Sequence, residues 1–321
     1  MNLRRRTAFA SLALWAIASM ASAQSYPSKP ITLVVPYPAG AAVDRVGRAL
    51  GLELQKRLGQ PVVIDNVGGA SGTIGAKKVQ RAAPDGYTLL VGTVNDMLVA
   101  PVVIKAGYTS KDFTPITRLS QNTTVLVAHP GFAANTVDEL VALGQKQSGP
   151  LMAGASGVAM MQTIGGTLLA QAGGFRLDHI PYTGGAPLLT DLAGGQVQLG
   201  TVALMSALPM IREGRLKALG IISTHRDPTA PNIPTVNEGQ RVKGVEADLW
   251  TGVLGPAGLP EPVVARLNAV LKEIMTDAAY RDAEFKAGSV VIEPNDGKAF
   301  AQFLLREETR LKPTLADVKA N

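Results

Sequence analysis

Short apolar runs rich in β-branched residues alternate along this chain with segments whose apolar positions recur every three or four residues. The first run, 31–35, predicts a buried strand. An amphipathic helix is expected over 43–58, because Val46, Leu50 and Leu54 share one face of it. The loop between strand and helix contains glycine, and the helix start presents free N–H groups and a positive dipole end. This arrangement favours binding of an anion without a charged side chain.

The same alternation continues along most of the chain. We expect strands at 31–35, 62–64, 87–92, 124–128, 151–155, 178–181, 197–202, 217–222 and 250–254. Helices are expected at 43–58, 72–82, 94–100, 136–147, 159–172, 185–194, 204–213, 260–276, 278–287 and 295–311. Strands separated by helices are typical of parallel sheets covered on both faces. The sequence therefore predicts an α/β protein with two doubly wound sheets.

Two segments interrupt this alternation. Residues 122–128 follow a long expected loop, 106–120, and predict a strand that crosses into a second domain. A return crossing is expected at 246–254, and two domains suit a chain longer than one ordinary core. The expected division is a signal peptide at 1–23, a first lobe at 24–122 plus 246–321, and a second lobe at 123–245.

The N-terminus has the pattern of an export signal. Arg4, Arg5 and Arg6 precede an apolar run at 8–18, and small residues up to Ala23 form a cleavage site. The apolar run is too short for a membrane-spanning helix. The chain contains no cysteine, which excludes disulfides, thiolate metal sites and a lipid-anchored cysteine. We expect cleavage near Ala23 and a periplasmic mature protein.

Charge and motifs exclude several functional classes. Loss of 1–23 removes three arginines and no acid, lowering the formal net charge from +6 to +3, and the remaining excess is scattered. A nucleic-acid surface is therefore not expected. The three histidines, His129, His179 and His225, lie in separate segments, and no nucleophile elbow, metal-ligand spacing or dinucleotide fingerprint occurs. We expect no enzyme activity, no catalytic residue, no cofactor and no metal.

Several short motifs occur in order along almost the whole mature chain, from Tyr26 to about Lys312. They are Tyr26-Pro-x-Lys-Pro-Ile, Pro36-Tyr-Pro-Ala-Gly-x-Ala-x-Asp44, Gly59-Gln-Pro-Val-Val63, Asn66-x-x-Gly-Ala-x-Gly-x-Ile-Gly75, Ala82-Ala-Pro-Asp-Gly-Tyr-Thr-Leu-Leu90, Ile180-Pro-Tyr-x-Gly-Gly-Ala-Pro187, Asp191-Leu-x-Gly-Gly-Gln-Val197, Ser206-Ala-Leu-Pro209, Pro234-Thr-Val-x-Glu238 and Leu254-x-Pro-Ala-Gly258. In this order the chain resembles the periplasmic solute-binding proteins of tripartite tricarboxylate transporters, the Bug or TctC family.

The resemblance implies a two-lobed periplasmic-binding-protein fold of type II-like form, with two crossover strands and the ligand in the cleft between the lobes. It also implies a monomer that captures a small organic acid by lobe closure and delivers it to the membrane subunits of a transporter. A periplasmic sensor that presents its ligand to a two-component receptor uses the same clamp, and the sequence does not separate the two.

Loops at the carboxyl ends of strands are the expected sources of ligand contacts. In the first lobe the candidates are Tyr37, Ala39, Gly40, Ala41, Asp44, Thr93 and Asn95. Backbone N–H groups of 39–41 are expected to hold a carboxylate. Asp44 either caps the helix or helps to order the ligand.

The second lobe offers a counterpart loop after 151–155. The candidates there are Ser156, Gly157, Ala159, Met161, Tyr182 and Thr183. Ser156 is either a helix cap or a ligand contact, and Met160 and Met161 either pack the helix or line the distal pocket. Because methionine is an apolar filler, the second alternative favours a ligand whose far end is weakly polar.

Overall fold

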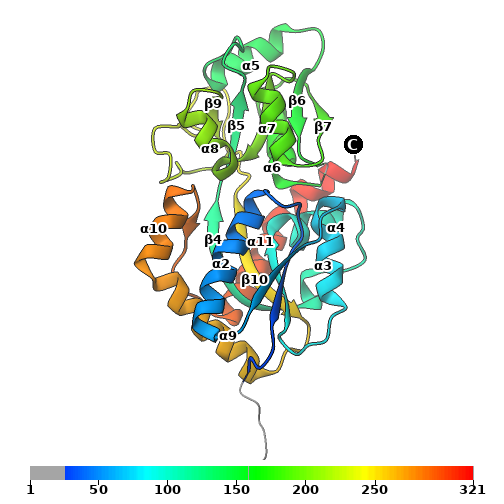
Figure 1. Ribbon diagram of the computed structural model, residues 1–321. Helices are drawn as coiled ribbons and strands as arrows, with labels where there is room; N and C mark the ends of the chain where they lie inside the picture. The colour runs from blue at the N-terminus through cyan, green and yellow to red at the C-terminus, as the bar shows by residue number, and fades with distance from the viewer. Residues whose placement is uncertain (1–25, 158, 321) are drawn as a thin grey trace, which may run out of the picture.

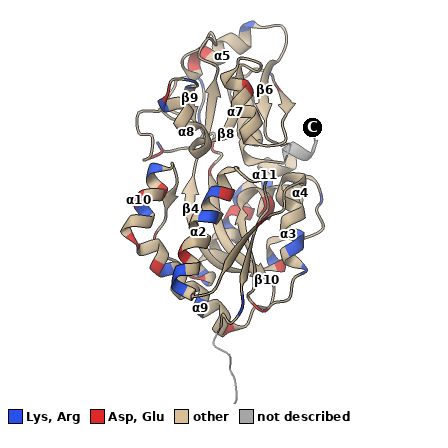
Figure 2. Cartoon of the chain, in the orientation of Figure 1, with Lys and Arg blue, Asp and Glu red and all other residues tan. Residues whose placement is uncertain are grey.

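The computed structural model describes residues 26–157 and 159–320, so the expected signal peptide lies outside the described residues. Two lobes are stacked one above the other, each built on its own β-sheet (Figure 1). We define the first lobe as the elements around the six-stranded sheet and the second lobe as those around the five-stranded sheet. Basic and acidic residues are interspersed along the helices around the first sheet (Figure 2).

The six-stranded sheet has the order β11-β4-β10-β3-β1-β2. Its strands are β1 (Ile31–Val35), β2 (Val62–Asn66), β3 (Thr88–Thr93), β4 (Phe113–Asn122), β10 (Leu249–Pro256) and β11 (Val290–Val291). Strands β2, β1 and β3 are parallel, whereas β10 is antiparallel to both β3 and β4. The sheet is therefore mixed, because β4 and β10 carry the chain out of the lobe and back.

Strand β4 corrects the expected long loop at 106–120. Its ten residues include buried polar side chains, and these hid the strand in the sequence pattern. Their polar atoms are satisfied locally: Thr117 Oγ1 donates to the Asn295 carbonyl at 2.9 Å, and Ser120 Oγ contacts Thr251 Oγ1. Pairing of this kind allows polar residues to occupy an interior strand.

The five-stranded sheet has the order β7-β6-β8-β5-β9. Its strands are β5 (Thr124–Ala128), β6 (Leu151–Ala155), β7 (Leu177–Pro181), β8 (Leu199–Ala203) and β9 (Lys217–Ile221). Strands β7, β6 and β8 are parallel, and β5 is antiparallel to both β8 and β9. All five correspond to strands expected from the sequence.

Helices cover both sheets. Around the first sheet are α2 (Ala42–Leu58), α3 (Thr73–Gln80), α4 (Ala100–Val103), α9 (Glu261–Thr276), α10 (Ala278–Lys286), α11 (Gly297–Ala320) and the short helices η1 (Ala70–Gly72), η2 (Asn95–Val99) and η3 (Ser110–Asp112). Around the second are α5 (Val137–Lys146), α6 (Met161–Gly173), α7 (Gly185–Ala193) and α8 (Leu204–Arg212). The helix expected at 94–100 is divided into a π-helical turn, η2, and α4.

The packing of α2 fixes the loop that precedes it. Val46, Leu50 and Leu54 are buried, as their spacing predicts. A Cβ added at Gly47 would lie 2.7 Å from Val35 Cγ2, so glycine is needed for the helix to approach β1 so closely. The helix ends where Gly59 adopts a left-handed conformation and its N–H bonds the Gln55 carbonyl.

The chain passes between the lobes from β4 into β5 and returns before β10. Trp250, at the start of β10, packs edge-to-face against Phe300 and Phe303 of α11. Further along α11, Arg310 pairs with Glu246 of the returning segment at 3.1 Å. The end of α11 lies beside the junction between the lobes (Figure 1), so this helix braces the return crossing.

Candidate functional site

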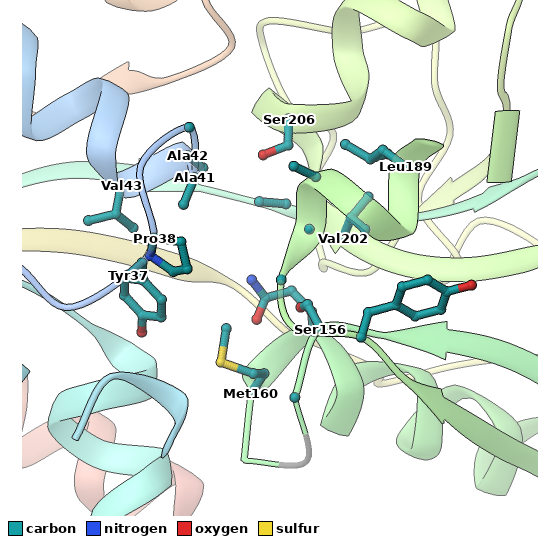
Figure 3. Close-up of a pocket in the computed structure, with 18 of the residues that line it drawn as sticks. Tyr37, Pro38, Ala41, Ala42, Val43, Ser156, Met160, Leu189, Val202 and Ser206 are labelled. Carbon is teal, nitrogen blue, oxygen red and sulfur yellow. The ribbon is translucent and has the colours of Figure 1, made fainter. Parts of the chain in front are cut away.

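A cavity of about 1000 Å³ lies between the lobes. The first lobe lines it with the loop after β1, residues 69–72 and the start of η2, and the second lobe with loops after β6, β7 and β8. The side chains labelled in Figure 3 approach one another from these two sides. The expected site residues on this wall are Tyr37, Gly40, Ala41, Asn95, Ser156, Gly157, Tyr182 and Thr183. The structure thus brings together residues that are widely separated in the sequence.

The other expected residues lie beside the described wall. Ala39 is exposed on the loop after β1, and Asp44 is buried in the first turn of α2. Thr93 lines a smaller cavity of about 50 Å³ between Asn95 and Trp250. Ala159 and Met161 are buried in the core, with at most 1% of their surface exposed.

The loop after β1 differs from the sequence interpretation in its hydrogen bonds. Asp44 is not the helix cap, because α2 begins at Ala42 and Ala41 occupies the cap position. The Asp44 carboxylate instead accepts the Gly40 N–H at 2.9 Å, and the Ala41 N–H donates to the Pro38 carbonyl at 3.2 Å. These two N–H groups are therefore already engaged within the loop.

The free backbone donors lie one residue further on. Within the described part of the chain, the N–H groups of Ala42 and Val43 have no hydrogen-bond acceptor, and both residues line the cavity. They belong to the first turn of α2, where the helix dipole is positive. Of the main-chain segments that line the cavity, this turn is the best suited to bind an anion.

Asp44 holds this turn in place. Besides the Gly40 N–H, its carboxylate accepts Arg48 Nε at 3.0 Å and Asn66 Nδ2 at 2.9 Å. Burial alone would raise the pKa of Asp44, but the hydrogen bonds from Arg48, Gly40 and Asn66 outweigh it, and the pKa is lowered. The ionised carboxylate therefore ties the loop to α2 and to the end of β2.

The second-lobe loop also differs from expectation. Ser156 does not cap the next helix, because α6 begins at Met161 and its cap residue, Met160, provides no side-chain hydrogen bond. The Ser156 side chain is at the cavity wall instead (Figure 3). Met160 also lines the wall, where its thioether extends toward Tyr37. Gln162 is a further residue of the wall.

A buried polar cluster supports the first-lobe wall beneath Tyr37. The Tyr37 hydroxyl donates to Asp96 Oδ1 at 3.0 Å, and the Thr93 N–H donates to both Asp96 oxygens at 3.0 and 3.1 Å. Burial raises the pKa of Asp96 to about 7, although the hydrogen bonds from Thr93 and Tyr37 oppose the shift. Asp96 was not among the site residues expected from the sequence. The feature that could have indicated it is an acidic residue within an otherwise apolar segment.

Two further parts of the wall are not among the site residues expected from the sequence. One is 69–72, where the non-glycine residues Ala70 and Ser71 adopt positive φ values of 47° and 54°. Such backbone conformations are strained and occur often at functional sites. The other is the start of α8, where Ala203, Met205 and Ser206 line the cavity.

Three charged residues belong to the described wall, and each has an oppositely charged partner. Arg45 of α2 forms a double hydrogen bond with Glu284 of α10. Arg215 and Glu213 stand near each other after α8, with 3.6 Å between Nη1 and Oε2. Most of the remaining wall is apolar or backbone, so the charge of a bound anion would be met chiefly by backbone dipoles.

A model of the tripartite tricarboxylate transporter family receptor, TctC, matches residues 46–319. The chain belongs to this family. A relative from Pseudomonas sp. strain P51, the UPF0065 protein in the tcbD-tcbE intergenic region, is 34% identical over 85% of this chain and 82% of its own. Protein BugT of Bordetella pertussis is 31% identical over 94% of both chains.

Solved structures agree with this TctC assignment. The MatC protein of Rhodopseudomonas palustris with bound malate is 32% identical and superposes with a TM-score of 0.84, covering 90% of this chain and all of its own. An R. palustris protein solved with adipate is 26% identical, with a TM-score of 0.86 over 92% of this chain and 98% of its own. The two-lobed α/β periplasmic-binding-protein fold predicted from the sequence is confirmed.

The family also settles the broad class of function. TctC members are periplasmic binding proteins, so this chain is a periplasmic solute-binding protein and not an enzyme. In the described ranges, no cluster of three or more His, Asp or Glu side chains is arranged to hold a metal ion. None of the described helices is both long and apolar enough to cross a bilayer.

Proposed function

We propose that this protein captures a small organic acid between its lobes, closes around it, and delivers it to the membrane subunits of a tripartite tricarboxylate-type transporter. The observation that carries the proposal is the first turn of α2, where Ala42 and Val43 line a cavity of about 1000 Å³ and their N–H groups have no acceptor in the described chain. Backbone donors at a helix start bind carboxylates well.

The opposite wall supports a ligand with one polar and one apolar end. Ser156 and Thr183 offer hydroxyl groups to a carboxylate, while Leu189, Val202 and Met160 provide apolar surface. The cavity volume is at the upper end of the range that is usual for small-molecule sites. Two similar structures were solved with malate and with adipate, which also favours a carboxylate ligand here.

A thermal-shift screen with matched pairs tests the ligand class. Nicotinate and nicotinamide, or benzoate and benzamide, share their shape and differ in charge; malate, adipate and citrate extend the series. A ligand at a hundredfold excess over its Kd raises stability by about 2.7 kcal/mol. We expect at least one acid to stabilise the protein while its amide does not. Equal stabilisation by an acid and its amide would show that the negative charge of the ligand is not recognised, and would contradict this part of the proposal.

Delivery to a transporter needs a separate test. The protein is immobilised and mixed with detergent-solubilised membranes of its own host, with and without the stabilising acid. We expect transporter subunits to be retained more strongly with the acid, because a closed receptor presents a different surface. Retention of a sensor kinase in place of transporter subunits would instead support the alternative of a ligand-presenting co-receptor.

A further inference from the structure

The Asn95 side chain joins the two lobes at the cavity wall. Its Oδ1 atom accepts the Met161 N–H at 2.7 Å, and its Nδ2 atom donates to Gln162 Oε1 at 3.3 Å. Asn95 belongs to η2 of the first lobe, whereas both partners belong to the first turn of α6 in the second. The first N–H of α6 is thus satisfied by a residue 66 positions away.

Among its described residues, the second lobe offers no side chain of its own for this role. Helix starts leave N–H groups that usually bond to a cap residue in the preceding loop. The cap position of α6 is Met160, which makes no side-chain hydrogen bond. The 2.7 Å contact with Asn95 exists only while the lobes are together, because its two atoms lie on different lobes.

Asn95 is held firmly in its own lobe. Its backbone N–H donates to Thr93 Oγ1 at 3.2 Å. The adjacent Asp96 carboxylate is fixed by the Thr93 N–H and the Tyr37 hydroxyl. Asn95 is 4% exposed with the lobes together, and its amide bonds Met161 and Gln162 of the other lobe.

We propose that Asn95 is a latch that caps α6 when the lobes close and thereby favours the closed form even before a ligand binds. The inference rests on the lobe closure of the proposed function and adds the residue that sets its equilibrium. Because Asn95 already occupies the first N–H of α6, the latch also positions the ligand. It leaves the first turn of α2 as the backbone donor for the ligand's anionic end.

The contact beside the latch is consistent with a close approach of the lobes. A Cβ added at Gly157 would lie 3.3 Å from Ser71 Oγ, so the second-lobe loop and the strained segment 69–72 are nearly in van der Waals contact. Asn95 and Gln162 both line the cavity. The latch is therefore next to the ligand and not at a remote surface.

The test measures the separation of the lobes without any ligand. The chain has no cysteine, so Lys146→Cys on α5 and Lys272→Cys on α9, both exposed, give one label on each lobe for pulsed electron paramagnetic resonance. Loss of one buried neutral hydrogen bond corresponds to about a fivefold change in an equilibrium. We expect Asn95→Ala to lower the closed-to-open ratio by about that factor. An unchanged distance distribution would overturn the latch.

Two further variants separate the latch from a general loss of stability. Gln162→Ala removes only the longer hydrogen bond and should shift the ratio less than Asn95→Ala does. Asn95→Asp keeps the acceptor for the Met161 N–H but loses the donor to Gln162, so its ratio should fall only about as far as that of Gln162→Ala. If Asn95→Asp opens the lobes as much as Asn95→Ala, the hydrogen bond to Met161 is not the cause and the proposal is wrong.

An adipate titration distinguishes this inference from the proposed function. Asn95→Asp adds a negative charge to the cavity wall, so adipate should bind it at least tenfold more weakly than the parent protein, although its lobes still close. If Asn95→Ala opens the lobes but no acid binds either protein, the latch stands and the ligand class is wrong. If acids bind and the lobe distances do not respond to Asn95, the ligand class stands and the latch is wrong.

Discussion

Arg45 of α2 donates from both terminal guanidinium nitrogens to Glu284 of α10, at 2.8 Å to Oε1 and 2.9 Å to Oε2. Glu284 is almost completely buried, while Arg45 lines the cavity. A bidentate pair of this geometry holds the guanidinium firmly in one place. The cation nearest to the first turn of α2 is thus committed to a protein carboxylate and not to the ligand.

Glu284→Gln should release this cation toward the cavity. We expect dicarboxylates such as adipate to gain affinity relative to benzoate, because the second carboxylate then meets an uncompensated positive charge. Stability should fall by about 1–3 kcal/mol, less than for a fully buried pair, because Arg45 reaches solvent. Calorimetric titrations with both acids measure the ratio. Glu53→Gln, which removes an acid paired with Arg57 of the same helix, is the control and should leave the ratio unchanged.

Asp44→Ala should loosen the loop that precedes the α2 donors. The change leaves the Gly40 N–H and Asn66 Nδ2 without their carboxylate, at a cost of about 1–3 kcal/mol in the free energy of unfolding. Carboxylate affinity should fall as well, because the donors of Ala42 and Val43 are no longer held in position. Urea unfolding and calorimetry measure the two effects. Asp44→Asn, which retains one acceptor oxygen, should be intermediate in both; full affinity in Asp44→Ala would show that the loop is rigid without it.

The sequence predicts an element of this fold when the residues that stabilise it form a local pattern. The run at 31–35 and the spacing of Val46, Leu50 and Leu54 specify a strand and a helix, because burial of one face produces both patterns. Strand β4 did not follow this rule, since its polar side chains are satisfied by partners such as Asn295, 178 residues from Thr117. Local pattern contains no information about such distant partners.

The same limit applies to the candidate site. The loops after β1 and β6 were predictable because glycine and a helix start follow a strand in each. The engagement of the Gly40 N–H by Asp44, and of the Met161 N–H by Asn95, was not predictable. Both hydrogen bonds depend on how the turns are oriented in three dimensions, and the second depends on how one lobe meets the other.

Asp96 should make stability decrease with pH. Burial raises its pKa from 3.8 to about 7, so between these values the folded state binds more protons than the unfolded state. The contribution of Asp96 is therefore fully present below about pH 4 and is lost as the pH rises through 7. Each pKa unit corresponds to about 1.4 kcal/mol, which places the loss at roughly 4 kcal/mol.

Asp96→Asn tests this relationship, since it resembles the protonated acid in size and hydrogen bonding. Urea unfolding is measured over about three pH units, from about pH 5 to about pH 8. The free energy of unfolding should change less with pH in the variant than in the parent protein. The difference should be largest at the alkaline end. Parallel profiles would mean that Asp96 is ionised throughout and that its partners offset its burial.

The apolar side chains on the second-lobe wall of the cavity should exclude a tricarboxylate. Met160, Leu189 and Val202 provide apolar surface there, and burying a second unpaired carboxylate against it costs several kcal/mol. We therefore expect benzoate to bind at least two decades more tightly than citrate. Competition between the two acids in a calorimetric titration measures the ratio, and tighter binding of citrate would contradict the prediction.

The two adjacent methionines provide a matched pair for the same measurement. The Met160 side chain lines the cavity, whereas that of Met161 is 1% exposed and packs in the core. Met160→Ser should reduce the difference in affinity between benzoate and citrate, because a hydroxyl replaces a thioether on the wall. Met161→Ser should lower stability by about 2–4 kcal/mol, as large-to-small core changes do, and leave the ratio unchanged. If Met161→Ser changed the ratio of the two affinities and Met160→Ser did not, α6 would have to rearrange so that Met161, and not Met160, forms the apolar wall near the ligand.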